Sequence, residues 1–94
     1  MPDMSSMDPA RRQDLLDRLK RIEGQARGIQ KMIDEGRDCD AVIQQVSAMK
    51  SATHALSGKL LEGYITYCLT HPDDFDSSGT SVATMVDTVV KASR

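Results

Sequence analysis

The feature that most constrains this chain is a long stretch, residues 38–71, that contains no proline and is followed by Pro72. A proline disfavours helical backbone in the residue before it, so a helix through this stretch would end near residue 71. Apolar residues and one Thr recur within it at spacings of three and four: Val42, Val46, Met49, Thr53, Leu56 and Leu60. That spacing predicts a single helix, and a helix of this length is typical of bundles and coiled coils.

Two cysteines mark the ends of this predicted helix. Cys39 and Cys68 lie 29 positions apart, which on an α-helix is about 20° more than a whole number of turns. Both thiols would therefore point the same way, about 43 Å apart along the helix axis. They cannot meet within one chain, but a second copy lying antiparallel would bring Cys39 of one chain to Cys68 of the other. The two-fold axis of such a pair would cross near Thr53 and His54.

Shorter patterns predict two more helices. Asp8 followed by Pro9 is typical of a helix start, and apolar residues then recur every three or four positions as far as a C-terminal cap at Gly36. A third helix is predicted to begin at Thr80 or Ser81. The chain therefore divides into a flexible tail over residues 1–8 and one helical domain over residues 9–92, with long helices at about 9–35 and 38–71 and an acidic, Ser-rich loop at 73–79.

An all-α fold follows, in which the protomer has two long antiparallel helices and a short C-terminal helix. One protomer leaves much of the apolar seam of its second helix uncovered. Pairing two protomers gives an antiparallel four-helix-bundle dimer, and pairing two dimers gives a tetramer. The composition suits helices that bury their faces by self-association, because aliphatic residues and Met are plentiful while Phe, Tyr and Trp together number only three.

Composition also excludes several classes of function. No run of about 18 or more apolar residues occurs, so neither a transmembrane helix nor a membrane partner is expected. The first residues lack the apolar stretch of a signal peptide, so the expected location is cytoplasmic. No nucleophile, base and orienting group can be assembled from these residues, so the chain is not expected to be an enzyme.

The residues alone leave two interpretations of the cysteines open. Both can be small buried apolar side chains, as free cysteines commonly are. Alternatively they are sensor thiols, because cytoplasmic cysteine pairs are more often redox-active or metal-binding than structural disulfides. A helix N-terminus stabilises a thiolate, so Cys39 would be the attacking thiol and Cys68, near the other helix end, the resolving thiol.

Two motifs carry a resemblance to a known family. The stretch RLKRIEGQ at residues 18–25 and the segment DCDAVIQQVSA at residues 38–48 resemble the small helical repressors of the CsoR/RcnR family. The resemblance covers nearly the whole chain, from about Asp14 to Val90. It implies a three-helix protomer, antiparallel dimers that pair into homotetramers, and binding of double-stranded operator DNA without a helix-turn-helix.

For copper-sensing members, the resemblance implies a trigonal Cu(I) site. Its ligands are a Cys at the start of the second helix and a His and a Cys of the other protomer. Cys39 and Cys68 match the thiol positions, Tyr64 stands at the His position, and Ile43 would line the site with Tyr64. Thiolates and imidazole suit Cu(I), whereas a neutral phenol is a poor ligand. A Cu(I)-responsive repressor of copper efflux genes is therefore the alternative function.

A sibling subgroup, the CstR-like proteins, keeps both cysteines and lacks the ligand His, and the chain resembles it most closely. That resemblance implies a repressor that senses reactive sulfur species, with no metal and no cofactor. Cys39 takes a sulfane sulfur from a persulfide or polysulfide, and Cys68 of the partner subunit closes a disulfide, trisulfide or tetrasulfide bridge that releases operator DNA. A minor alternative is a formaldehyde-responsive repressor that uses the amine of Pro2 together with Cys39.

Basic side chains on the two long helices are candidates for contacts with DNA phosphates. Arg18 and Arg21 match the basic motif of the family, and Lys50 and Lys59 are further candidates from their charge and position. Phosphate contacts of this kind give an affinity that falls steeply with salt. The competing interpretation is a solvated helix face held by intrahelical pairs, because Asp14 and Asp17 stand four residues before Arg18 and Arg21.

Overall fold

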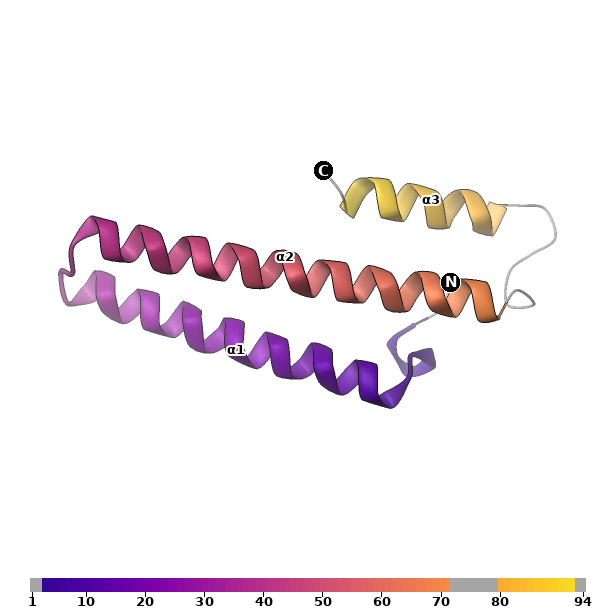
Figure 1. Ribbon diagram of the computed structural model, residues 1–94, viewed down its shortest axis with the longest axis horizontal. Helices are drawn as coiled ribbons and strands as arrows, with labels where there is room; N and C mark the ends of the chain where they lie inside the picture. Colours follow the sequence, from indigo (N-terminus) through magenta and orange to yellow (C-terminus); the bar gives the residue numbers. More distant parts are fainter. Residues whose placement is uncertain (1–2, 72–79, 93–94) are drawn as a thin grey trace.

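Figure 1 shows the arrangement of the helices in the computed structural model, which describes residues 3–71 and 80–92, and side chains within 80–92 only at 84 and 86–92. The elements in chain order are η1 (Met4–Ser6), α1 (Pro9–Asp34), α2 (Cys39–Thr70) and α3 (Thr80–Ala92). No strand occurs among the described residues, and the predicted all-α fold with a three-helix protomer is confirmed. The predicted loop at 73–79 lies outside the described residues.

The boundaries of α1 follow from local chemistry. The Asp8 carboxylate accepts a hydrogen bond from the backbone N–H of Arg11 at 3.2 Å, and Pro9 occupies the first helical position, where its missing N–H costs nothing. At the other end Gly36 has φ +72°, a backbone conformation that L side chains rarely adopt. The backbone N–H groups of Gly36 and Arg37 donate to the carbonyls of Ile33 and Met32 at 3.1 and 2.9 Å. This is a Schellman motif, and it turns the chain back toward α1.

Helix α2 is also capped at both ends. The Asp38 side chain accepts a hydrogen bond from the backbone N–H of Ala41 at 2.7 Å, which satisfies one of the free donors of the first turn. At the far end the backbone N–H of His71 donates to the carbonyl of Tyr67 at 2.9 Å. The His71 ring stacks on the Tyr67 ring, with centroids 4.3 Å apart and an interplanar angle of 11°. The two cysteines consequently lie on one continuous helix.

The three helices form a thin layer. Figure 1 shows α1 and α2 antiparallel and side by side, with α3 lying along the second half of α2. The principal extents are 57 × 27 × 14 Å, and the shortest is close to the thickness of a single helix with its side chains, about 10–12 Å. None of the described helices is both long enough and apolar enough to cross a membrane.

A layer one helix thick buries little apolar surface. Among the described residues the buried apolar side chains are Leu15, Ile29 and Cys68. Many aliphatic side chains are instead exposed on all three helices: Leu16, Leu19, Ile33, Ile43, Val46, Leu60, Leu69, Val86 and Val90. Exposed apolar surface on this scale is unusual for a monomer and is typical of an association surface.

The N-terminal segment includes a short helix that no sequence pattern predicts. Residues 4–6 form the helix η1, capped by the Asp3 side chain, within the stretch 1–8 that is predicted to be a flexible tail. Met7 is half-buried, and its side chain reaches Gly63 of α2. Apolar packing against α2 holds this segment in position, and sequence patterns do not reveal such packing.

Candidate functional site

Cys68 lies in an enclosed position near the end of α2. Its side chain is only 6% exposed. Tyr64, one helical turn earlier, donates a hydrogen bond from its hydroxyl to the Cys68 sulfur, and the same hydroxyl is hydrogen-bonded with Thr88 of α3. The phenol of Tyr64 therefore links the thiol to the third helix.

This environment shifts both titrating groups. Burial raises the pKa of the Cys68 thiol, and the hydrogen bond from Tyr64 opposes that rise in part. Burial also raises the pKa of Tyr64, and the nearby Cys68 sulfur adds to the effect. A low-dielectric setting disfavours the charged form of each acid. Cys68 is thus held as a neutral thiol and Tyr64 as a neutral phenol, which suits Cys68 to the second, resolving step rather than to the first attack on an electrophile.

Cys39 has contrasting surroundings at the start of α2. It is the first residue of the helix and is exposed. Ile43, one turn later, is 61% exposed, and Val46 is 43% exposed. These aliphatic side chains lie within about 40° of Cys39 around the helix axis. The Cys39 thiol is therefore accessible and lies on the same helix face as these exposed apolar side chains.

The two thiols do not meet within the chain. They lie on one unbroken helix, which keeps them about 43 Å apart and within about 20° of the same direction. Thr53 and His54, at the midpoint between them, are exposed. Among the described residues of a single chain, no group of three His, Cys, Asp or Glu side chains gathers closely enough to hold a metal ion. Pro2, the other residue of the formaldehyde hypothesis, lies outside the described residues.

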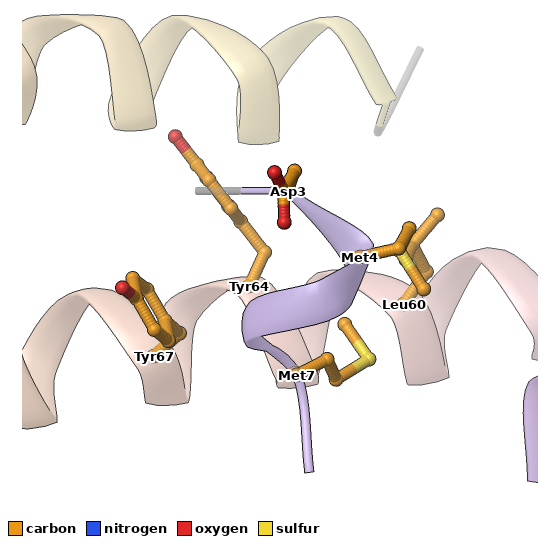
Figure 2. Close-up of a pocket in the computed structure, with 7 residues that line it drawn as sticks. Asp3, Met4, Met7, Leu60, Tyr64 and Tyr67 are labelled. Atoms are coloured by element: carbon orange, nitrogen blue, oxygen red, sulfur yellow. The ribbon is translucent and has the colours of Figure 1, made fainter. Parts of the chain in front are cut away.

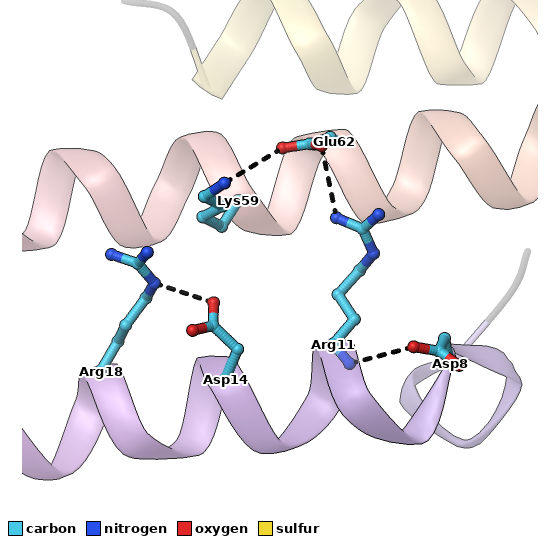
Figure 3. A network of polar contacts seen from close by, with 6 residues as sticks. All are labelled: Asp8, Arg11, Asp14, Arg18, Lys59 and Glu62. Carbon is cyan, nitrogen blue, oxygen red and sulfur yellow. Dashed lines mark hydrogen bonds and ion pairs between the residues drawn. The ribbon is translucent and has the colours of Figure 1, made fainter.

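Three of the four predicted DNA-contacting residues act on one carboxylate, that of Asp14, and Figure 3 shows two of them, Arg18 and Lys59. Arg18 pairs with Asp14 at 2.9 Å. The pKa of Asp14 is lowered chiefly by this hydrogen bond, and the positive charges of Arg18, Lys59 and Arg21 add to the effect. Arg18, Arg21 and Lys59 therefore form a basic cluster that spans α1 and α2, with Asp14 at its centre.

The basic cluster continues toward the start of α1. Glu62 pairs with Lys59 at 3.7 Å and with Arg11 at 3.8 Å (Figure 3). Lys50 does not join these residues, because nine positions along α2 place it about 180° around the helix from Lys59. Asp14 and Glu62 thus moderate the charge of the cluster. The spacing of four residues predicts the Asp14–Arg18 pair, but the contacts between α1 and α2 have no local signal in the sequence.

Comparison with known proteins places these features in context. A family model described as "Metal-sensitive transcriptional repressor" matches residues 11–93. The copper-sensing transcriptional repressor RicR of Mycobacterium tuberculosis (strain H37Rv) is 43% identical over 53 residues, which are 56% of this chain and 55% of RicR. The transcriptional repressor RcnR of Citrobacter koseri is 35% identical over 63 residues, which are 67% of this chain and 70% of that protein. The match to RicR thus spans little more than half of its length.

Two solved structures share the fold. The copper-sensing repressor CsoR with Cu(I) from Geobacillus thermodenitrificans NG80-2 aligns with a TM-score of 0.79 and 29% identity, over 100% of this chain and 94% of that chain. The nickel-responsive transcriptional regulator InrS aligns with a TM-score of 0.73 and 29% identity, over 85% of this chain and 90% of that chain. The described helices therefore take the arrangement found in two metal-responsive regulators.

Proposed function

Because this chain belongs to the family of metal-sensitive transcriptional repressors, we propose that it is a DNA-binding repressor whose inducer is a reactive sulfur species. The observation that carries the choice of inducer is the state of Cys68. The Tyr64 phenol occupies the position where copper-sensing members are expected to place an imidazole, and it is hydrogen-bonded to the thiol. The surroundings of Cys68 thus suit reactions of the thiol itself.

The proposed sensor is assembled from two antiparallel protomers. In such a pair the exposed Cys39 of one protomer faces Cys68 of the partner subunit, and the exposed Ile43 and Val46 supply apolar surface beside it. Pairing two protomers would also cover part of the exposed aliphatic surface on α1 and α2. The thin layer of helices supports this assembly, because no other element of the described chain covers the exposed aliphatic side chains of α1 and α2.

The proposed chemistry proceeds in two balanced steps. The Cys39 thiolate attacks a sulfane sulfur of a polysulfide, and the remaining sulfur chain leaves as a thiolate, so Cys39 becomes a persulfide. Cys68 of the partner subunit then attacks the inner sulfur of this persulfide, forms a disulfide and releases hydrogen sulfide. If Cys39 carries one more sulfur, attack on the sulfur next to the terminal one gives a trisulfide and again releases hydrogen sulfide. One sulfane sulfur of the inducer is reduced to sulfide while the two thiols are oxidised, and the crosslink favours a form with low DNA affinity.

A gel-shift experiment tests this proposal. Wild-type protein treated with sodium tetrasulfide is expected to lose operator affinity, to run as a covalent dimer on a non-reducing gel and to recover on addition of dithiothreitol. The Cys39→Ala and Cys68→Ala variants are expected to keep their DNA affinity after the same treatment. Loss of affinity in either variant would contradict the proposed crosslink.

Cu(I) is the second candidate inducer, supported by the family description and by the likeness to a CsoR structure with Cu(I). The donors fit Cu(I) only in part. Two thiolates from two protomers are suitable soft ligands, but a neutral phenol at Tyr64 is not. A titration against a tight Cu(I) chelator separates the candidates. Sulfur sensing predicts weak Cu(I) binding with no release of DNA, and Tyr64→His is expected to strengthen Cu(I) binding.

A further inference from the structure

The N-terminal segment lies directly over the α2 face that carries both tyrosines. Figure 2 shows Asp3, Met4 and Met7 on one side of a cavity whose other side is formed by Leu60, Tyr64 and Tyr67. The cavity has a volume of about 140 Å³. Residues at the beginning of the chain thus line the same cavity as the phenol that holds Cys68.

Local hydrogen bonds give this segment a defined shape. The Asp3 carboxylate accepts from the backbone N–H of Ser5 at 2.9 Å and from the Ser5 hydroxyl, and these bonds lower the pKa of Asp3. The backbone N–H groups of Ser6 and Met7 donate to the carbonyls of Asp3 and Met4 at 3.1 and 3.3 Å. Residues 3–7 therefore reach α2 as a preformed turn that presents two methionine side chains.

A glycine of α2 accommodates the segment. A Cβ atom added at Gly63 would lie 2.8 Å from the Met7 Cε and 2.5 Å from the Arg11 Cδ, both far inside normal van der Waals contact. Gly63 is buried, and a glycine in mid-helix costs about 1 kcal/mol relative to alanine. An alanine at this position would therefore require the side-chain ends of Met7 and Arg11 to move away from α2.

We propose that residues 3–7 form a clamp, seated on Gly63, that holds Tyr64 against Cys68 and so controls the access of inducer to the second thiol. Three observations support it: Met7 lies against Gly63, Asp3 and Met4 line the same cavity as Tyr64, and the Tyr64 hydroxyl is hydrogen-bonded to the Cys68 sulfur. When the clamp leaves α2, the Tyr64 ring keeps its hydrogen bond with Thr88 but loses the covering segment on the α2 side, and Cys68 becomes more accessible. The role in sensing depends on the proposed function, whereas the control of thiol access does not.

Two glycines of α2 make a matched pair of variants. Both Gly63→Ala and Gly58→Ala raise helix propensity, but a Cβ at Gly58 meets nothing within 4 Å. Each is made in the Cys39→Ala background, so that Cys68 is the single thiol. The clamp predicts that Gly63→Ala increases the rate of Cys68 alkylation by iodoacetamide severalfold, measured by mass spectrometry, and that Gly58→Ala leaves the rate unchanged.

A second readout follows the clamp itself. The chain has two tyrosines and no tryptophan, and both tyrosines line the cavity under the clamp. Spectrophotometric titration of phenolate is expected to show one tyrosine of Gly63→Ala ionising at lower pH than in wild type, because burial that raises the pKa of Tyr64 is relieved. Gly58→Ala should titrate like wild type.

A third variant keeps the proposal testable if Gly63→Ala does not fold. Met4→Ser combined with Met7→Ser removes the two apolar anchors without altering α2, and it is expected to reproduce the faster alkylation and the shifted titration. Wild-type alkylation rates and titration curves in a folded Gly63→Ala variant or in this double variant would overturn the clamp. Neither measurement uses DNA or sulfane sulfur, so a failure of the proposed inducer leaves the result of this test intact.

Discussion

The two cysteines differ most in what surrounds their sulfur atoms. Cys39 is exposed at a helix start, whereas Cys68 is enclosed and hydrogen-bonded to Tyr64. A buried thiol with a raised pKa reacts slowly until a partner or an opening of the structure brings an electrophile to it. The asymmetry favours an order of events in which Cys39 captures the inducer first.

Removing the hydroxyl of Tyr64 tests what sets the pKa of the Cys68 thiol. Its pKa is raised by burial and lowered in part by the bond from Tyr64, so Tyr64→Phe is expected to raise it further. The pH dependence of Cys68 alkylation in a Cys39→Ala background should therefore have its midpoint at higher pH, because one lost hydrogen bond of roughly 0.5–1.5 kcal/mol lowers the ionisation constant about two- to twelvefold. The midpoint reports the pKa of the thiol separately from its accessibility, which scales the rate at every pH. Tyr67→Phe is the control, and an equal shift of the midpoint in both variants would contradict the role of Tyr64.

Asp14, the carboxylate in the basic cluster, is expected to influence the affinity for DNA. Asp14 pairs with Arg18 and lies near Lys59 and Arg21, so Asp14→Asn raises the positive charge that faces phosphate. Operator affinity is expected to increase, and Arg18→Ala is expected to reduce both the affinity and the slope of log K against log salt by about one. Fluorescence anisotropy at four salt concentrations measures both. Asp87→Asn on α3, which breaks the Lys91 pair, is the charge-matched control and should change affinity less.

At the scale of the elements, the turn between α1 and α2 fixes how the long helices lie beside each other. Gly36 adopts φ +72°, and a Cβ atom added there would meet nothing within 4 Å. Gly36→Ala is therefore expected to destabilise the protein through the backbone, by about 1 kcal/mol. Gly28→Ala, in the middle of α1 and also in open space, should instead stabilise it by up to about 1 kcal/mol. Urea denaturation followed by circular dichroism measures both, and equal effects of the two substitutions would contradict this account.

Helix ends were predictable because their causes lie within a few residues. Asp8, Pro9, Gly36 and Asp38 each act on a neighbouring backbone group, and the sequence shows such neighbours directly. The contact of Tyr64 with Thr88 and the seating of Met7 on Gly63 join segments far apart in the chain. Spacing and composition hold no signal for such contacts. The sequence therefore predicts the helices and singles out the two cysteines as candidate sensor thiols, but it holds no signal for the contacts that surround Cys68.

At the scale of the whole molecule, the thin layer of helices predicts association. Ile43 is 61% exposed beside Cys39, and burying such a side chain contributes about 1.5–3 kcal/mol. Ile43→Glu is expected to weaken the dimer at least about tenfold, because each 1.4 kcal/mol is a factor of ten. Sedimentation over a range of concentrations measures this. Gln44→Glu adds the same charge on another side of α2 and should leave association unchanged; equal weakening by both would show that charge alone is responsible.

Because α2 is one continuous helix, the number of residues between the two cysteines determines the relative direction of their sulfur atoms. One residue inserted between the cysteines of Cys39–Thr70 would rotate one sulfur by about 100° relative to the other, and deletion would do the same in reverse. Additions of about 7, 11 or 18 residues restore the phase, because they come close to whole turns. For the proposed sensor, in which both thiols must face the partner subunit, the interval between the cysteines can therefore lengthen or shorten only by those steps.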